Sequence, residues 1–233
     1  MPIRRIAVLS VALVLGVFGV AGTAAAETGA SNGAIYTVTS KAVDLGDNWH
    51  VDVGQLAGGD AAVAAAFNDA SVASGKSLGG ALGDDDVIRD DATLQATPVV
   101  SFRPTAVAQV LTGVYYHHGA AHPLDYVATV VIDSRTARPI TLDALFTDQQ
   151  AGLNRLSEQT KVIFPQTLGG TVPMADEPGN APLAKNFHNW IPTATGMEIH
   201  FEDYQFGHGL PVITVPWSAL TDLLAPDLAA LAR

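Results

Sequence analysis

Three strand-like segments follow one another between Leu94 and Ile132 with no helical segment between them. Consecutive strands joined by short connections pair antiparallel, because parallel neighbours need a long crossover. We expect strands over 98–103, 106–116 and 125–132. No alternating strand and helix rhythm runs through the chain. The sequence therefore predicts an α+β fold built on a mostly antiparallel sheet, with one main helix packed across it.

The segments on the N-terminal side predict a hairpin, a helix and a loop. Residues 34–43 alternate like a strand, and 49–53 is its expected partner across a turn of glycine, aspartate and asparagine. Asp60 can cap a helix over 61–73. The stretch 74–91 is rich in glycine and aspartate, so we expect a long loop or a frayed hairpin there.

The C-terminal side predicts a second helix and a last group of strands. Thr147 and Gln150 have the spacing of a capping box, and Pro165 is expected to end the helix that follows. Ser218 is expected to cap a short helix that runs to Leu224. Between the two helices, strands are expected over 186–191, 197–202 and 212–215.

The first 26 residues have the pattern of a secretory signal peptide. Arg4 and Arg5 precede an apolar run over 6–22, and the small residues Ala24–Ala26 provide a cleavage site. We expect a secreted chain that begins at Glu27 and has no permanent membrane anchor. An uncleaved anchor is the alternative, because the apolar run approaches the length that spans a bilayer.

Charge and composition limit the partners of the mature chain. Two of the 12 lysines and arginines and none of the 23 acidic residues lie in the signal segment, so the mature chain has a formal net charge of −13. This charge argues against nucleic acid or anionic lipid as a partner and favours cationic ones. The chain has no cysteine. We expect one domain over 27–233, with halves at about 34–116 and 117–224, stabilised by burial alone.

Five short motifs follow one another along the chain, at 116–123 (YHHGAAHP), 140–146 (ITLDALF), 186–187 (NF), 196–201 (GMEIHF) and 215–220 (VPWSAL). In this order and spacing, they resemble the RsiV-like family of extracytoplasmic domains of unknown function. The family includes the ectodomain of the lysozyme-sensing anti-sigma factor RsiV and a secreted immunogenic antigen of mycobacteria. The segments 36–43 and 60–67 are also similar to its N-terminal half.

The resemblance implies an α+β fold with a β-grasp-like C-terminal half, cell-wall association and a role in recognition. The chain has Gly119-Ala120-Ala121-His122 where family members usually show Gly-Gly-Ala-His. Only five residues precede the apolar run, so anti-sigma activity is not implied. Recognition of lysozyme is implied only as one option.

Two segments combine aromatic and histidine side chains that suit a contact surface, and we expect them to lie close together. The candidate ligand-binding residues are Tyr116, His117, His118 and His122 of the first segment and Tyr204, Phe206 and His208 of the second. These residues predict a non-catalytic binding protein whose ligand is a protein or a cell-envelope component.

Metal and catalytic sites are the alternatives to a binding surface. His118 and His122 would share a helical face, but Gly119 and Pro123 disfavour a helix there, so we expect no metal and no cofactor. A secreted serine esterase is the leading enzymatic alternative, although the chain has no G-x-S-x-G motif. The segment 74–77 (SGKS) lacks the first glycine of a phosphate-binding loop. The acidic run 84–86 lacks the spacing of a calcium-binding loop.

Overall fold

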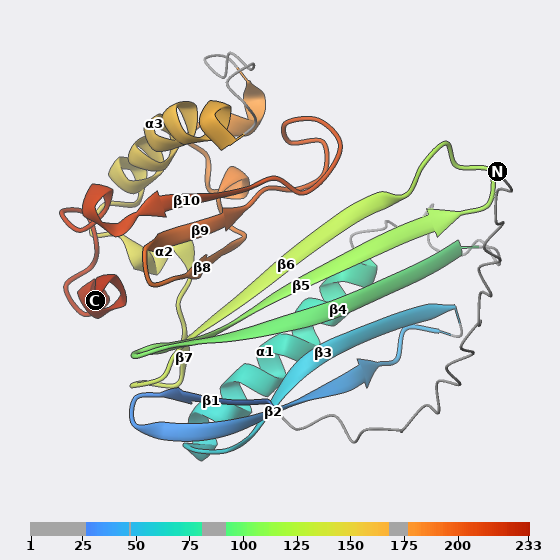
Figure 1. The fold of residues 1–233 in the computed structure, drawn as a ribbon, viewed down its shortest axis with the longest axis horizontal. Helices are drawn as coiled ribbons and strands as arrows, with labels where there is room; N and C mark the ends of the chain where they lie inside the picture. The colour runs from blue at the N-terminus through green and yellow to red at the C-terminus, as the bar shows by residue number, and fades with distance from the viewer. Residues whose placement is uncertain (1–26, 47, 81–91, 168–176) are drawn as a thin grey trace, which may run out of the picture.

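The computed structural model describes residues 27–46, 48–80, 92–167 and 177–233, which form an α+β fold of two sheets (Figure 1). The expected signal segment 1–26 and the acidic run 84–86 lie outside the described residues. The first sheet and its helix consist of β1 (Glu27–Ser31), β2 (Ala34–Val43), β3 (Trp49–Gly58), α1 (Ala61–Gly80), β4 (Ala92–Arg103), β5 (Ala106–His117), β6 (Leu124–Asp133) and β7 (Arg138–Pro139). The C-terminal unit consists of α2 (Leu142–Leu145), α3 (Gln149–Thr167), η1 (Pro178–Asn180), η2 (Ala184–Asn186), β8 (Trp190–Pro192), β9 (Gly196–His200), β10 (Val212–Pro216), η3 (Trp217–Ala219) and η4 (Ala229–Ala232).

The seven strands of the first sheet lie in sequence order, and all neighbours are antiparallel except β3 and β4. Those two pair in parallel over only three positions, from Trp49 with Leu94 to Val51 with Ala96. The antiparallel arrangement of the strands expected over 98–103, 106–116 and 125–132 is confirmed, and each strand is longer than its pattern indicated. The expected division at about residue 117 places β6 in the C-terminal half, but β6 pairs with β5 along its whole length.

Gln109 of β5 is a buried glutamine whose side chain forms hydrogen bonds with both β3 and α1. The side-chain oxygen of Gln109 accepts hydrogen bonds from the Gly54 N–H at 2.7 Å and the Ser71 hydroxyl at 3.1 Å, and its amide nitrogen donates to Ser74 Oγ at 3.2 Å. Gln109 is fully buried. A buried amide is costly without such partners, so this residue ties β5, β3 and α1 together.

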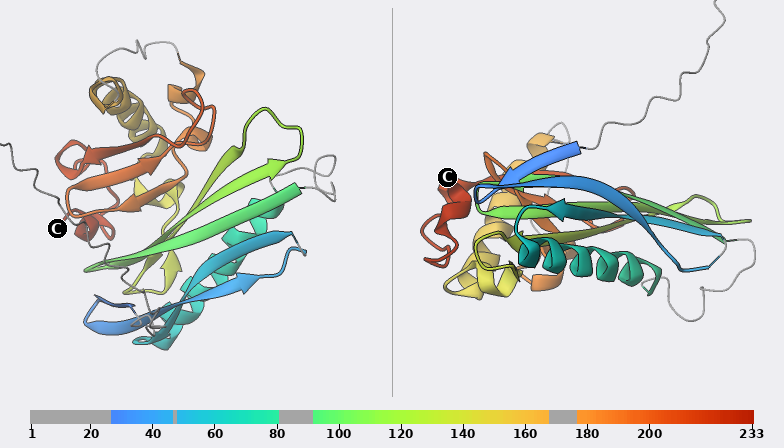
Figure 2. Two further views of the ribbon diagram at one scale, coloured as in Figure 1. Left: turned by 45° about the vertical axis from the view of Figure 1, so that its right-hand side comes forward. Right: turned by 90° about the horizontal axis from the view of Figure 1, so that it is seen from below.

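Helix α1 lies along one face of the first sheet (Figure 2). Asp60 caps it as expected, because its Oδ1 accepts hydrogen bonds from the N–H groups of Ala62 and Val63. The predicted end at residue 73 is wrong, since the helix continues to Gly80. Gly75 and Leu78 are buried in this extension, and their packing against the sheet outweighs the poor helix propensity of glycine.

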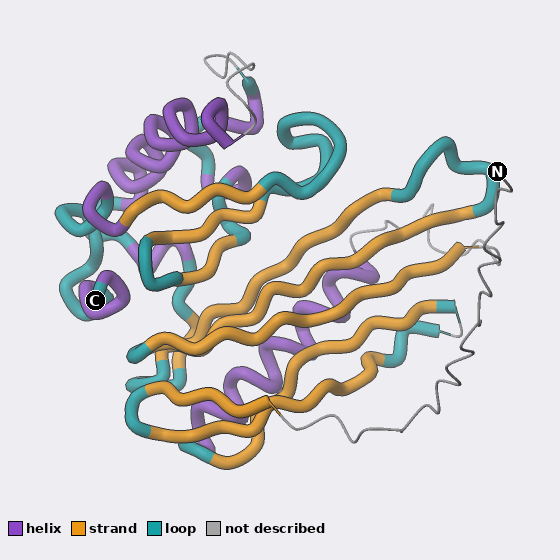
Figure 3. Tube along the Cα trace, viewed as in Figure 1, coloured by secondary structure: helices purple, strands orange, loops and turns teal. Residues whose placement is uncertain are grey.

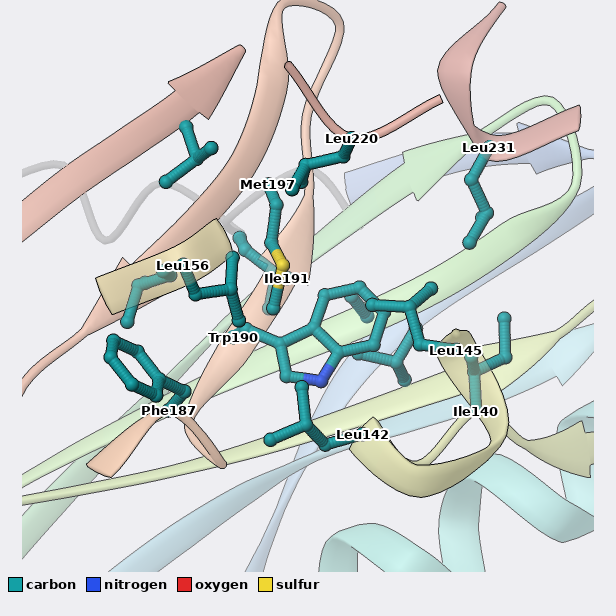
Figure 4. Packing of buried hydrophobic residues seen from close by; sticks show 14 of the residues in the cluster. Ile140, Leu142, Leu145, Leu156, Phe187, Trp190, Ile191, Met197, Leu220 and Leu231 are labelled. Atoms are coloured by element: carbon teal, nitrogen blue, oxygen red, sulfur yellow. The ribbon is translucent and has the colours of Figure 1, made fainter. Parts of the chain in front are cut away.

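The C-terminal unit packs on the opposite face of β5 and β6. Its core includes Ala108 and Val110 of β5, whereas their neighbours Val107 and Leu111 belong to the clusters on the α1 side. Side chains alternate between the two faces of a strand, so the same two strands are covered on both sides. Within the unit, α3 packs against β10 of the three-stranded antiparallel sheet. Figure 4 shows the Trp190 ring among the surrounding aliphatic side chains of this core.

The start of α3 differs from the prediction. The helix begins after Asp148, whose Oδ1 accepts a hydrogen bond from the Ala151 N–H at 3.0 Å. The hydroxyl of Thr147 instead donates to the Leu224 carbonyl at 3.3 Å. Thr147 therefore attaches the C-terminal segment, and Asp148 caps the helix. Pro165 does not end α3, which continues to Thr167.

Two further predictions near the C-terminus need correction. The helix expected from Ser218 to Leu224 is only the 3₁₀ turn η3, because its residues are anchored elsewhere. The Trp217 indole N–H donates to the Thr193 carbonyl at 2.9 Å, and Leu224 forms a β-bridge with Phe146. The strand expected over 186–191 begins only at Trp190. None of the helices within the described residues is both long and apolar enough to cross a membrane.

Candidate functional site

The two segments chosen from the sequence meet beside the start of β6, although about 80 residues separate them. Residues 118–123 and 204–208 are loops in Figure 3, while Tyr116 and His117 end strand β5. The Tyr204 hydroxyl lies 2.7 Å from Nε2 of His122, and the ring of His208 lies 4.7 Å from the ring of His122 and 5.5 Å from that of Tyr204. All three side chains are exposed. We call His122, Tyr204 and His208 the His–Tyr cluster.

Asp203 builds the turn that presents this cluster. Its Oδ1 accepts hydrogen bonds from the Gly209 N–H at 2.7 Å, the Tyr204 N–H at 3.1 Å and His208 Nδ1 at 3.0 Å. Its Oδ2 accepts one from the Asp125 N–H at 3.0 Å, which attaches the turn to β6. The backbone of Tyr204 has a φ of 63°, a left-handed conformation that is unfavourable for a tyrosine and is held by these contacts.

The same contacts set the ionisation of Asp203. Its side chain is only 7% exposed, and burial, the largest single influence, would raise its pKa. The hydrogen bonds from the N–H groups of Asp125 and Gly209 and from His208 together outweigh burial and lower the pKa. Asp203 therefore stays charged and acts as a fixed anchor for the turn. Sequence reasoning missed this residue, and its only signal was an aspartate ahead of Gly207 and Gly209.

The other four predicted binding residues lie around the cluster or beneath it. Tyr116 is 39% exposed near the end of β5, and His118 is exposed in the loop that follows. Nδ1 of His117 lies 3.2 Å from the His118 carbonyl oxygen. Phe206 turns inward, and its ring lies 4.5 Å from that of Phe164 in the C-terminal core. Phe206 thus supports the turn from below.

Three potential metal ligands also meet here. One ligand atom from each of Asp125, Asp203 and His208 lies within 4.8 Å of the others. Asp203 already binds His208 and three backbone N–H groups, so the turn accounts for this arrangement by itself. The expectation that no metal is needed stays a prediction.

A cleft of about 870 Å³ adjoins the cluster, between α1 and the C-terminal unit. Its floor is the stretch 124–130 of β6, and one wall is formed by α1, mostly by small residues such as Ala73 and Ser77. The other wall includes His188, Glu202 and Tyr204. Sequence reasoning did not find this cleft, because its three sides come from segments far apart in the chain.

Most of the charged groups of the cleft lie on the wall formed by the C-terminal unit. His188 Nε2 lies 3.3 Å from Glu202 Oε1, and this contact raises the pKa of His188 against the opposing effect of burial. It also lowers the pKa of Glu202. Asp125 and Asp203 line the same cleft, so carboxylates outnumber the basic groups among its lining residues.

The two serines of the cleft bind the backbone of their own helix. The hydroxyls of Ser74 and Ser77 each donate, at 2.8 Å, to the carbonyl three residues earlier. Helical serines commonly make such contacts. For these two residues, the contacts favour a local structural role over activation by a histidine.

Comparison with known proteins supports the fold alone. The structure is similar to a DUF3298 family protein from Pseudomonas aeruginosa, with a TM-score of 0.54 and 13% identity over 88% of this chain and 96% of that chain. It is also similar to a DUF3298 member from Bacteroides fragilis, with a TM-score of 0.55 and 13% identity over 89% of this chain and 97% of that chain. No family model and no curated protein matches the sequence. The fold is thus shared, across nearly the whole chain, with domains of unknown function.

Proposed function

We propose that the chain is an exported, non-catalytic binding protein of the RsiV-like type, with a contact surface centred on the His–Tyr cluster. The observation that carries the proposal is the contact between Tyr204 and His122 on two exposed loops. Tyr204 is 54% exposed and keeps a strained backbone conformation through Asp203. Aromatic side chains held rigidly on loops give contact area at little entropic cost, which suits recognition.

The charge of the chain indicates the kind of partner. A net charge of −13 on the mature chain attracts cationic proteins or cationic cell-envelope components and speeds their association. Lysozyme is a suitable cationic probe, because the resemblance includes a lysozyme-sensing protein. Added salt should weaken the complex by screening the attraction.

Calorimetric titration of purified residues 27–233 with lysozyme tests the surface. We expect Tyr204→Ala and His122→Ala each to weaken binding by about fivefold or more, as for residues at the centre of an interface. His50→Ala is the matched control, because His50 is an exposed histidine of β3 outside the cluster. Equal affinity for all three variants and the parent protein would remove the cluster from the proposal.

Export is part of the proposal and has its own test. Intact-mass measurement of protein from the culture medium should give a chain that begins at Glu27, because small residues at 24–26 suit signal peptidase. Recovery only of the full-length chain, in membranes, would contradict export as a cleaved protein.

The esterase alternative can be tested with the same protein. A non-catalytic protein should not hydrolyse short-chain aryl esters above the rate of the buffer. Turnover that a single serine-to-alanine change abolishes, with the fold intact by circular dichroism, would replace the binding proposal with an enzymatic one.

A further inference from the structure

The floor of the cleft is an open strand edge. β6 pairs with β5 on one side, but on the other side β7 covers only Ile132 and Asp133. The stretch 124–130 that lines the cleft therefore pairs with no other strand on that side within the described residues. Unpaired strand edges are templates for the addition of another strand.

Two contacts show which backbone groups point into the cleft. The Val131 carbonyl accepts a hydrogen bond from the Ile140 N–H, and the Asp125 N–H donates to Asp203, both on the side away from β5. Alternate residues of a strand direct their N–H and C=O groups to the same side. The backbone groups of Val127 and Thr129 therefore also point away from β5, toward the cleft.

The walls leave space for a chain beside this edge. On the α1 side all lining residues except Leu78 are alanines or serines, and Ala73 and Ser77 are exposed. The seven lining residues of β6 give an edge of roughly 20 Å, enough for a short strand at ordinary spacing. The opposite wall carries the carboxylates of Glu202 and Asp203, with Asp125 at the end of the edge.

We propose that this cleft binds an extended, lysine- or arginine-rich segment of a partner protein, which adds as a strand to the open edge of β6. Backbone hydrogen bonds to Val127 and Thr129 supply affinity, and the excess of carboxylates over basic groups along the cleft favours basic side chains. This proposal adds a partner and a site to the proposed function. It rests on that function in one respect only, namely that the chain is a binding protein. It places the basic segment at the strand edge, apart from His122, which does not line the cleft.

A fluorescent peptide of alternating lysine and valine is the probe, used with purified residues 27–233. We expect binding that falls about tenfold or more when glutamate replaces lysine, because the carboxylates then repel the peptide. N-methylation of two consecutive central residues should also weaken binding, since each edge of the peptide then lacks a donor. Equal binding of all three peptides would overturn the proposal.

Amide hydrogen exchange locates the bound peptide residue by residue. Exchange at Val127 and Thr129 should slow when peptide is added, while exchange at Ala128, which points toward β5, should stay unchanged. Peptide binding without protection at Val127 and Thr129 would overturn strand addition. Protection of these amides in a peptide-free dimer, detected by sedimentation, would assign the edge to a second copy and also overturn it.

Variants separate this site from the His–Tyr cluster. Ala73→Phe should fill the cleft and weaken the peptide at least about tenfold, whereas Ala65→Phe, at an exposed alanine of α1 outside the cleft, should not. His122→Ala should weaken lysozyme binding, as expected for the cluster, and leave peptide affinity unchanged, because His122 does not line the cleft. Lysozyme binding that His122→Ala does not weaken, with intact peptide binding, would fault only the cluster. Peptide affinity unaffected by Ala73→Phe would fault only the cleft.

Discussion

The two faces of the first sheet are packed differently around β5 and β6. On one face the C-terminal unit buries large rings, among them Phe187, Trp190 and Phe201. The other face buries fewer rings, and α1 approaches it closely at glycines: a Cβ on Gly113 of β5 would lie 2.8 Å from Leu78, and one on Gly75 would lie 2.8 Å from Val53 of the neighbouring strand β3. The aromatic face should therefore be sensitive to the removal of atoms, and the α1 face to their addition.

Truncation of the aromatic core should have the largest effect. Trp190 is only 2% exposed, so Trp190→Ala should lower the free energy of unfolding by about 3–5 kcal/mol through lost burial and the cavity left behind. Urea denaturation measures this change. Val162→Ala, at an exposed position of α3, is the control and should change stability by no more than about 0.5 kcal/mol. Similar losses in the two variants would show that the aromatic core is not tightly packed.

Enlargement on the α1 face should have the next largest effect. Gly113→Val would force added atoms against Leu78 and Ala96, at a cost of about 1–3 kcal/mol. Thr112→Val places the same side chain one residue earlier, at an exposed position, and should be nearly neutral. If Gly113→Val were as stable as Thr112→Val, the close approach of α1 would not be a constraint.

The smallest expected effect is a dependence of stability on pH. Burial lowers the pKa of His200 in the C-terminal unit and outweighs the attraction of Glu198, whose Oε1 lies 3.0 Å from Nε2 of His200. The unfolded chain then binds this proton more readily, so the free energy of unfolding should fall as the pH drops below about 6.5. Denaturation at pH 7 and pH 5.5 measures the fall, and His200→Gln should reduce it. An equal fall in that variant would assign it to other groups.

The sequence predicted the elements whose pattern is local. The alternation along β5 and β6 placed both strands, and Asp60 marked the start of α1. The end of α1 was misplaced because Gly75 and Leu78 are held by the sheet, and a local count of glycines contains no information on that packing.

The candidate site was predictable only in part. Aromatic and histidine residues stood out in the sequence, so His122, Tyr204 and His208 were named as candidates, and the structure brings them together. Their role in binding stays a prediction. Asp203 was not found, because its role depends on the Asp125 N–H, 78 residues earlier in the chain. The cleft could not be predicted from the sequence either, because its floor and walls come from three segments that are far apart in the chain.

The most direct test of the account is a two-dimensional amide NMR titration of residues 27–233 with lysozyme. We expect the amide shifts to gather in residues 118–129 and 202–209, where the loops and the cleft adjoin, while the amide of Val162 on α3 stays unchanged. Shifts confined to α3 and the far strands β1 and β2, with none in those two segments, would contradict a binding surface beside β6.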